Sequence, residues 1–537
     1  TVLMLSRGRT VPTLHYRRPN PKLQLDRTPF RVATTSEPWT AAGRPLRAGV
    51  SAFGIGGTNA HAIVEQAPQA AASAAAPREQ ALILSAQSEA ALKAMSHDLA
   101  AHLEQRPDLD LADVAYTLQV GRARFEHRRV VVAADRTHAA AQLRTDGPID
   151  AALRATGAVF LFPGQGAQFP GMAADHYAHL PAFARELDAL LALPETPAEL
   201  RDLLLEPGDD PARAERFART DLAQPGVFAV SLALARALRD AWGVAPVALA
   251  GHSLGEYVAA TLAGVFTPQD AMRLIVARGR LMQAAPTGAM LSVSLPARAL
   301  VDLLGDCEVA AVNAPEQTVV SGTEDAIAAL ESQLFARGVA TRRLRTSHAY
   351  HSRLMDGVQA HLRAELADIT LRPPTAPFVS CLTGAWISPT QATDPDYWVA
   401  QLRHPVLFAD VARTLLAAGH AVFLEVGPGG HLTALMRRQA GFGREQRAWA
   451  TAPHAVDRTP TTALLDALAR LDGCGAGPDW SAVHRAPRRR VPLPTYPFER
   501  RRYWRDPAAH NAQSTAAPTG ATRLPDPQDW FHRDVWR

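Results

Sequence analysis

The sequence predicts an α/β protein: a core with a parallel sheet, a smaller inserted β-α-β-β-α-β unit, and a small α+β domain ahead of the core. An apolar, strand-like run at Ala245–Ala250 leads through Gly251–Gly255 (GHSLG) into the helical pattern of Glu256–Ala263. Strand-like and helical segments then alternate over about 287–347 in the ferredoxin-like order. A shorter set of strands and helices occupies 68–155, ahead of the core.

Length and composition restrict the function classes. A chain of 537 residues has room for about three or four domains, and 47% hydrophobic residues allow sizeable cores. The net charge of +4 is small for this length, the arginines are dispersed, and no nucleic-acid recognition motif accompanies them. We interpret the clusters Arg488–Arg490 and Arg500–Arg502 as solvated basic faces rather than targeting signals. No nucleic-acid partner is therefore expected.

Cysteine usage and hydropathy point to a reducing, cytoplasmic location. Cys307, Cys381 and Cys474 lack metal-binding or redox spacing. No apolar run reaches membrane-spanning length and no signal-peptide pattern is present, so no membrane association is expected. The chain starts without Met in apparently mid-domain sequence, and we expect it to be a piece of something larger.

The first 67 residues do not resemble a complete domain. Val50–Glu65 has a Gly-rich turn at Gly54–Gly57 followed by a strand-like run, and Gln66–Pro77 is an Ala-rich connector. The next unit, 68–155, shows no catalytic constellation. Its expected elements are a strand at Ala81–Ser85, a helix at Ser88–Gln105 with Ser88 as N-cap, a helix at Asp110–Leu118, a strand at Arg128–Ala134 and a helix at Thr137–Leu143.

The core opens on a buried-strand run, Ala158–Pro163, followed by the Gly-rich turn Gly164–Gln168. Pro225–Trp242 reads as a helix. A serine nucleophile in acyl transfer needs two N–H groups aimed at the tetrahedral oxyanion. Leu254, directly after Ser253, supplies one naturally, and the loop at Gln165 can supply the other. The alternative is that Gly164 and Gly166 only make a turn.

Ser253 is the predicted nucleophile. Strand, Gly-x-Ser-x-Gly and helix in succession form the α/β-hydrolase-like nucleophile elbow, which exposes the serine above the sheet at a helix N-terminus. The alternative is a serine that caps the helix.

Arg278 is the second notable residue. The helix Thr267–Ala284 starts at an N-cap, Thr267, and places Arg278 on its apolar face, because the residues three and four positions away are Leu274, Ile275, Leu281 and Met282. A buried guanidinium needs an anion, and no acidic residue lies within one turn. Either a substrate carboxylate held by both arms of the guanidinium, or a distant Asp or Glu, meets this need.

Sequence spacing alone does not identify which histidine is the catalytic base. A serine nucleophile needs a nearby base, usually His. His348 and His351 follow the inserted unit, and His404, His420 and His431 compete with them; His252 is a poor base, because adjacent side chains diverge at an elbow. The inserted unit itself reads as strand Ala289–Leu295, helix Ala297–Leu304, strand Val309–Val312, strand Thr318–Ser321, helix Asp325–Arg337 and strand Thr341–Leu344.

The remaining sequence contains the last segments of the core and the chain that follows it. Tyr397 to Pro405 and Glu425–Leu432 belong to the core, which we expect to end near residue 440. Val491–Trp504 is rich in Pro and aromatic residues and suits extended packing over a neighbouring surface. The tail is expected to be disordered up to Pro525, with Asp529–Trp536 as the first strand of a further domain.

Five motifs together carry a family resemblance: FPGQGAQ (Phe162–Gln168), GHSLGEY (Gly251–Tyr257), RGRLMQ (Arg278–Gln283), HAYHS (His348–Ser352) and EVGPGG (Glu425–Gly430). In order and spacing, residues 156–440 resemble the malonyl-CoA:acyl-carrier-protein transacylase family, in the acyltransferase form of modular type I polyketide synthases. PTLH (Pro12–His15), PNP (Pro19–Pro21) and GGTNAHA (Gly56–Ala62) resemble the end of a ketosynthase domain.

The resemblance implies a domain order and a set of roles. The implied domains are a ketosynthase remnant (1–67), a ketosynthase–acyltransferase linker domain (68–155), the acyltransferase (156–440), a post-acyltransferase linker (441–505) and a tail to the next domain (506–537). Ser253 is implied as acylated nucleophile and His351 as base, its ring oriented by a backbone carbonyl. Gln165 and Leu254 are implied as oxyanion-hole amides, and Arg278 as the carboxylate-binding residue. His61 is not proposed as catalytic.

The implied activity is ping-pong transfer of malonyl from malonyl-CoA to Ser253 and then to the phosphopantetheine thiol of a carrier protein, without a tightly bound cofactor. The implied partners are that carrier protein and the ketosynthase and downstream domains of the same polypeptide. Leu254, His348 and Tyr350 resemble the malonyl-type signature, although the malonyl form of the family normally has Phe where Tyr350 stands. The alternatives are a methylmalonyl-selective enzyme, a fatty-acid-synthase transferase, a serine hydrolase and a non-catalytic scaffold.

Overall fold

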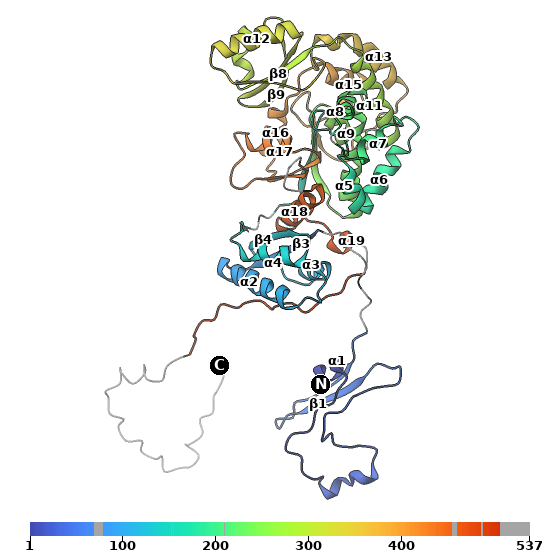
Figure 1. Cartoon of the computed structure of the whole chain (residues 1–537), viewed down its shortest axis with the longest axis vertical. Helices are drawn as coiled ribbons and strands as arrows, with labels where there is room; N and C mark the ends of the chain where they lie inside the picture. The colour runs from blue at the N-terminus through green and yellow to red at the C-terminus, as the bar shows by residue number, and fades with distance from the viewer. Residues whose placement is uncertain are drawn as a thin grey trace, which may run out of the picture.

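The computed structural model describes residues 1–504 except 69–72, 74–78, 152, 154, 209, 454–458 and 485–486. The tail, including the strand expected at Asp529–Trp536, lies outside the described residues, as does most of the Ala-rich connector. Four units follow one another: an N-terminal segment, a small α+β domain, the parallel-sheet core and the unit inserted into that core (Figure 1).

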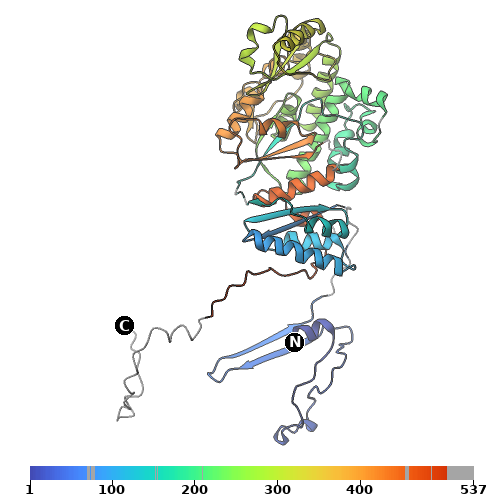
Figure 2. The same ribbon diagram turned by 60° about the vertical axis from the view of Figure 1, so that its left-hand side comes forward.

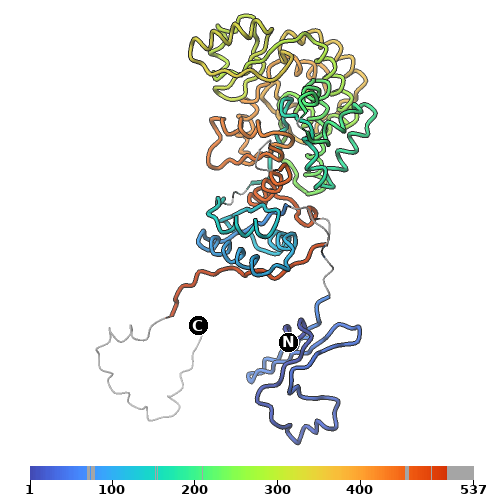
Figure 3. Tube along the Cα trace, viewed as in Figure 1, coloured from blue at the N-terminus to red at the C-terminus, as the bar shows by residue number. Residues whose placement is uncertain are grey.

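The N-terminal segment is a two-stranded antiparallel hairpin with short helical turns. Its apolar residues Phe53, Ile55 and Ile63 are exposed, and Figure 3 shows the segment apart from the other units. The hairpin therefore lacks a core of its own. The elements are α1 (Val2–Arg7), the 3-10 turns η1 (Pro21–Leu23) and η2 (Leu25–Arg27), β1 (Arg47–Phe53) and β2 (Asn59–Glu65).

The small domain is a three-stranded antiparallel sheet in the order β3-β4-β5, and its helices cover one face. Leu82 and Leu84 of β3 face those helices, whereas Ala81 and Ile83 face the core. Ser88 caps α2 by accepting from the Ala91 N–H, as predicted. The elements are β3 (Gln80–Ala86), α2 (Glu89–Gln105), α3 (Leu111–Val120), β4 (His127–Ala133), α4 (Arg136–Arg144) and β5 (Asp150–Ala151).

A five-stranded parallel sheet in the order β12-β7-β6-β13-β14 forms the core, as predicted for an α/β fold. Side chains of β6 alternate: Phe160 and Phe162 face α9, α10 and α11, whereas Val159 and Leu161 face α16 and α17. Helices thus cover both faces, which is the usual setting for parallel strands.

The core elements, in chain order, are β6 (Ala158–Phe162), α5 (Ala174–His179), α6 (Pro181–Leu191), α7 (Leu200–Leu205), α8 (Pro211–Ala218), α9 (Thr220–Arg236), the π-helix η3 (Ala237–Ala241), β7 (Pro246–Gly251), α10 (Leu254–Leu262), α11 (Pro268–Gln283), η6 (Arg353–Met355), α13 (Asp356–Ala367), β12 (Phe378–Val379), α14 (Pro389–Ala392), α15 (Pro395–Arg403), α16 (Phe408–Ala417), β13 (Val422–Pro428), α17 (His431–Arg437) and β14 (Arg447–Ala452). Beyond them lie α18 (Pro460–Gly473) and α19 (Trp480–His484).

The inserted unit has the strand order β11-β8-β10-β9, all antiparallel. Numbered within the unit this is 4-1-3-2, the ferredoxin-like arrangement that the element order predicted. The expected helix at Ala297–Leu304 is instead two 3-10 turns. The elements are β8 (Ala289–Val293), η4 (Ala297–Ala299), η5 (Val301–Leu303), β9 (Glu308–Ala314), β10 (Gln317–Gly322), α12 (Glu324–Ala336) and β11 (Thr341–Arg343).

Two predicted boundaries were wrong. The helix expected from Pro225 begins at Thr220, because the Gln283 side chain accepts from the Thr220 N–H and burial of the helix outweighs the hydrogen bond lost at Pro225. The core sheet also continues past residue 440, since β14 pairs in parallel with β13. Figure 2 shows α18 lying between this sheet and the small domain.

The Pro-rich segment after α19 crosses the small domain in extended form, as its composition predicted. Leu493 is buried among the apolar residues of that domain. Arg122 Nη2 donates to the Pro494 carbonyl at 3.0 Å, and the Tyr496 hydroxyl accepts from the Gln87 N–H at 3.0 Å. Segments 372 and 409 positions apart in the sequence therefore form one unit.

Candidate active site

Ser253 lies at a sharp turn between β7 and α10. Its φ of 51° and ψ of −108° are rarely adopted by a non-glycine residue. The flanking glycines make this turn possible: a Cβ on Gly251 would lie 2.0 Å from the Gly255 carbonyl carbon, and one on Gly255 would lie 2.0 Å from the Phe162 oxygen. The backbone therefore forms the predicted elbow.

His351 is the histidine that reaches this serine. Its Nε2 lies 2.8 Å from the Ser253 Oγ, and its Nδ1 lies 2.8 Å from the backbone carbonyl oxygen of His404. A carbonyl only accepts, so Nδ1 carries the proton and Nε2 accepts from the serine hydroxyl. The Ser253 side chain makes no helix-capping hydrogen bond, which contradicts the alternative that it serves as a cap.

The electrostatic surroundings keep this histidine neutral. Burial, with the nearby charge of Arg278, lowers the pKa of His351 to about 3. At neutral pH the ring is neutral, with its proton on Nδ1, so Nε2 can take a proton from the hydroxyl.

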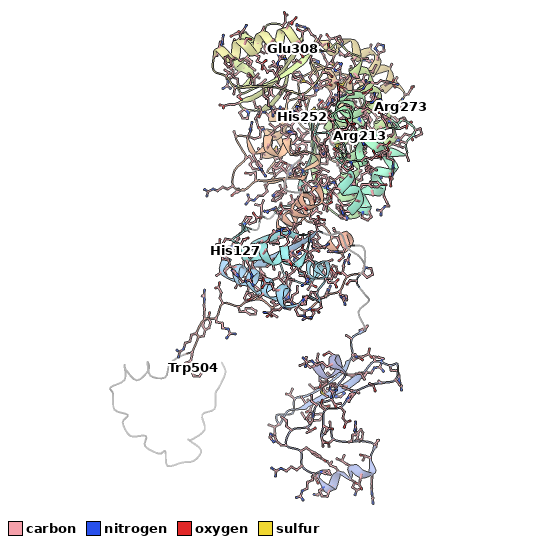
Figure 4. All side chains as sticks on the ribbon, in the orientation of Figure 1. His127, Arg213, His252, Arg273, Glu308 and Trp504 are labelled. Atoms are coloured by element: carbon pink, nitrogen blue, oxygen red, sulfur yellow. The ribbon has the colours of Figure 1, made fainter. Side chains whose placement is uncertain are left out.

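The other histidines lie in different positions. His252 turns away from Ser253, and its Nε2 lies 2.9 Å from the Asn313 Oδ1 on β9. Figure 4 labels His252 in the core, beneath the inserted unit that carries Glu308. The His348 Nδ1 lies 2.8 Å from the Ser347 Oγ, and His420 packs edge-on against Trp386. His404 contributes its backbone carbonyl.

Arg278 is buried, with 1% of its surface exposed, on the apolar face of α11 as predicted. Its Nη1 donates to the Gln224 Oε1 at 2.6 Å, and its guanidinium carbon lies 5.4 Å from the centre of the Tyr257 ring. Within the described chain its Nε and Nη2 have no hydrogen-bond partner, and the partner of its Nη1 is an uncharged amide rather than a carboxylate. Two donors thus remain for an anion.

Side chains from three elements connect this arginine to the Gly-rich loop. The Gln224 Nε2 lies 3.4 Å from the Gln165 Oε1, and the Gln165 Nε2 lies 3.4 Å from the Tyr350 hydroxyl. That hydroxyl also contacts the Thr220 Oγ1 at 2.5 Å, and the buried His348 ring stacks on Tyr350. Gln165, Arg278, His348 and Tyr350, predicted separately, therefore lie together.

The two loops expected to supply oxyanion donors abut each other. β6 and β7 are parallel neighbours, and the His252 N–H donates to the Phe162 carbonyl at 3.0 Å. Gly164 approaches the His252 backbone so closely that a Cβ would lie 2.8 Å from its oxygen. Leu254 is the first residue of α10, where a backbone N–H has no partner within the helix.

Sequence reasoning missed the polar residues that support these groups. Gln224, Gln401, Asn313 and the carbonyl of His404 were not singled out, and Glu256 was read only as part of a motif. Uncharged amides inside apolar helices were an available signal for Gln224 and Gln401. No sequence signal identifies a particular carbonyl. The described residues contain no cluster of three or more His, Cys, Asp or Glu placed to hold a metal ion.

Comparison with known proteins places this geometry in a family. The family model described as "Acyl transferase domain" matches residues 159–455. This chain belongs to the acyltransferase domains of polyketide synthases. A second family model, "CurL-like, PKS C-terminal", matches residues 80–143, within the small domain.

Relatives of the acyltransferase are large synthases. The chain is 40% identical over 535 residues to a phenolphthiocerol/phthiocerol polyketide synthase of Mycobacterium tuberculosis, covering 94% of this chain and 35% of that protein. It is 38% identical to the spectinabilin polyketide synthase system protein NorB of Streptomyces orinoci, covering 98% and 25%. The chain thus spans about a third of these relatives or less.

Solved structures agree with the fold of the acyltransferase. The acyl transferase domain of ZmaA superposes with a TM-score of 0.71 at 35% identity, covering 79% of this chain and all of that one. The SpnD acyl transferase domain, in complex with 2-(pent-4-yn-1-yl)malonyl, gives 0.69 at 35% identity, covering 76% and 98%. Across the described residues of the acyltransferase, no helix is both long and apolar enough to cross a membrane.

Proposed function

We propose that this acyltransferase loads a malonyl unit from malonyl-CoA onto Ser253 and transfers it to the phosphopantetheine thiol of an acyl carrier protein in polyketide biosynthesis. The single observation that supports this best is the buried Arg278, whose two unpartnered donors lie in the same site as the Ser253–His351 pair. A buried cation without a protein carboxylate calls for an anionic ligand.

The proposed chemistry is a two-step exchange at the serine oxygen. His351 Nε2 takes the Ser253 proton as the oxygen attacks the thioester carbonyl of malonyl-CoA, and the amides of Gln165 and Leu254 stabilise the oxyanion. As the carbon–sulfur bond breaks, His351 gives this proton to the CoA sulfur, and CoA leaves as the thiol. His351 then takes the proton of the carrier thiol as its sulfur attacks the serine ester, and gives that proton to the Ser253 oxygen as the ester C–O bond breaks.

The proposed preference for malonyl depends on the pocket wall. Arg278 holds the substrate carboxylate. Leu254, His348 and Tyr350 restrict the space beside it, and the contact with Thr220 fixes the Tyr350 ring. The SpnD domain was solved with 2-(pent-4-yn-1-yl)malonyl, a malonyl group substituted at carbon 2, which supports the proposed malonyl-class carboxylate but not the preference for the unsubstituted unit. One methyl group is worth about 1–3 kcal/mol in a pocket, so we expect a preference rather than absolute selection.

The proposed context is a larger polypeptide. Residues 1–67 are the end of a ketosynthase, and 68–155 are the linker domain between it and the acyltransferase. The exposed apolar hairpin of the first segment supports this, because it lacks a core of its own. The partners are the carrier protein, the ketosynthase and the domains that follow. No tightly bound cofactor takes part.

The decisive experiment is intact-protein mass spectrometry after brief incubation with equimolar malonyl-CoA and methylmalonyl-CoA. A malonyl adduct on the wild type that is absent from Ser253→Ala supports the proposal. A predominantly methylmalonyl adduct overturns the extender preference. Steady release of CoA and free malonate without a carrier protein, faster than transfer, points to a serine hydrolase instead. If the wild type forms no adduct and releases no CoA, a catalytic role for this site is contradicted.

A further inference from the structure

We propose that Gln401 is a positioning residue for the reaction, and that the last turn of α15 holds Ser253 and His351 in register with each other. The inference rests on the proposed function, since it assumes that this pair carries out the acyl transfer.

Gln401 holds the strained backbone of the nucleophile. It lies on α15 with 1% of its surface exposed, and its Nε2 donates to the backbone carbonyl oxygen of Ser253 at 2.8 Å. That oxygen also accepts from the Glu256 N–H at 3.1 Å. Because the φ and ψ of Ser253 are unfavourable for a side-chain-bearing residue, surrounding contacts must hold its peptide plane. Gln401 supplies the contact from outside the turn.

The same helix turn also orients the base. His404 follows Gln401 by three residues and ends α15, with its own N–H bonded to the Ala400 carbonyl. Its carbonyl oxygen is the partner of the His351 Nδ1 at 2.8 Å. A rigid helical turn therefore fixes the distance between the group that holds Ser253 and the group that holds His351.

A buried carboxyl group connects α15 to the helix that follows the nucleophile. Glu256 of α10 is fully buried, and its side chain accepts from the Tyr397 hydroxyl, from the Cys381 N–H at 3.2 Å and from the Gln401 Nε2 at 3.4 Å. Tyr397 and Gln401 lie four residues apart on α15 and so share the face that meets Glu256. This contact keeps the Gln401 amide in position beside Ser253.

The amide carries a cost that a purely structural residue would avoid. Among the described residues, the Gln401 Oε1 has no hydrogen-bond partner although it is buried. An unsatisfied buried acceptor destabilises a fold, and an apolar side chain of similar length would not carry that penalty. Stability alone therefore does not explain the amide, whereas orientation of Ser253 does.

The test compares Gln401→Met with the wild-type 537-residue chain. Methionine keeps the length of the side chain and removes the donor. We expect the single-turnover rate of malonyl-CoA acylation, followed by quenched intact mass, to fall about tenfold to a hundredfold, as small misplacements of reacting groups do. The half-saturating malonyl-CoA concentration and the melting temperature stay close to wild type.

The matched control is Gln119→Met. Gln119 is also a buried glutamine whose Nε2 donates to a backbone carbonyl at 2.8 Å, that of Ala81, but it lies in the small domain. The Gln119→Met variant should be acylated by malonyl-CoA at the wild-type rate. A wild-type rate in Gln401→Met, or an equal loss in both variants, overturns the inference.

The pH dependence of acylation in Gln401→Glu distinguishes a positioning role from a purely structural one. A carboxyl group there donates to the Ser253 carbonyl only when protonated, and Glu256 beside it favours the protonated form. The acylation rate of this variant should fall as pH rises, while the wild-type rate does not. A Gln401→Glu profile parallel to wild type contradicts the inference.

A second probe separates this inference from the proposed substrate. Phenylmethylsulfonyl fluoride forms a bond from its sulfur to an activated serine oxygen; fluoride leaves and the histidine takes the proton. If the wild type forms no malonyl adduct, the proposed function fails, but sulfonylation still compares the variants. Slower sulfonylation of Gln401→Met than of Gln119→Met supports the positioning role, and equal rates overturn it.

Discussion

Ser253 and His351, whose side chains meet at 2.8 Å, both have a positive φ, 51° and 57°. Only two other non-glycine residues of the described chain do, His15 and Gln24 in the N-terminal segment. Backbone strain in a folded domain persists when the surroundings determine it. In the core, therefore, strain coincides with the two groups proposed to react.

Removal of either group should stop or slow acylation. Ser253→Ala should form no malonyl adduct. His351→Ala should acylate about 10²–10⁴-fold more slowly, the usual range for loss of a general base. Quenched intact mass gives both values. His361→Ala, an exposed histidine on α13, is the control and should match wild type. An unchanged rate in His351→Ala would assign the base elsewhere.

Arg278→Ala should change the substrate as well as the rate. A hydrogen bond to a charged group contributes about 1.5–3 kcal/mol. Loss of the guanidinium should therefore lower the rate of malonyl loading about tenfold to a hundredfold. Acetyl loading, which needs no carboxylate partner, should fall much less. Competition between the two CoA esters measures the ratio. Arg280→Ala, exposed on the same helix, should keep the malonyl preference. Equal losses for both esters would contradict carboxylate binding.

The rate of acylation should be insensitive to mild acid. The base acts when neutral, and because the pKa of His351 is lowered to about 3, the ring stays neutral well below the ordinary histidine value. Single-turnover rates should therefore be flat between about pH 5 and 8 rather than halve near pH 6.5. A half-maximal rate near pH 6.5 would show that the free enzyme holds an ordinary histidine pKa.

Gly255→Ala should disable the elbow. Its Cβ would lie 2.0 Å from the Phe162 carbonyl oxygen, so β6 and α10 must separate. We expect a loss of several kcal/mol in the free energy of unfolding and no acylation, measured by urea denaturation and intact mass. Gly357→Ala is the control, since a Cβ there meets nothing within 4 Å; it should be neutral or stabilise by about 0.4–1 kcal/mol.

Tyr350→Ala should relax the extender preference. The ring fills space beside the proposed carboxylate site, and its removal leaves room for an α-methyl group. The ratio of malonyl to methylmalonyl adducts should move toward methylmalonyl by about 1–3 kcal/mol. Tyr503→Ala, with a largely exposed side chain, should leave the ratio unchanged. If Tyr350→Ala has the wild-type ratio of malonyl to methylmalonyl adducts, the Tyr350 ring does not determine extender selectivity.

The elbow and the inserted unit could be predicted because both depend on local pattern. Two glycines around Ser253 and a strand–helix switch specify a turn that few other residues can form. The strand order of the inserted unit follows from element order, because short connections allow few topologies. Arg278 was also accessible, since a charge on an apolar helix face is visible in helical spacing.

The supporting groups could not be predicted, because they are long-range contacts. The His404 carbonyl is a backbone atom present in every residue, and only the fold brings it to His351. Gln401 meets Ser253 across 148 positions of sequence. β14 was misread as linker because three of its six residues are Ala, which favours strands weakly; its pairing with β13 decides its structure.

The Pro-rich segment that crosses the small domain (Val491–Trp504) has a consequence for engineering chimaeric synthases. Its Glu499 accepts a hydrogen bond from Ser88 of the small domain, and α18 packs Leu464 and Leu468 among apolar residues shared with β3. A graft limited to 159–455 would remove α18 and expose that apolar surface. A transplant from about residue 79 to 499 carries the acyltransferase core, the small domain and the Pro-rich segment that crosses it as one exchangeable unit.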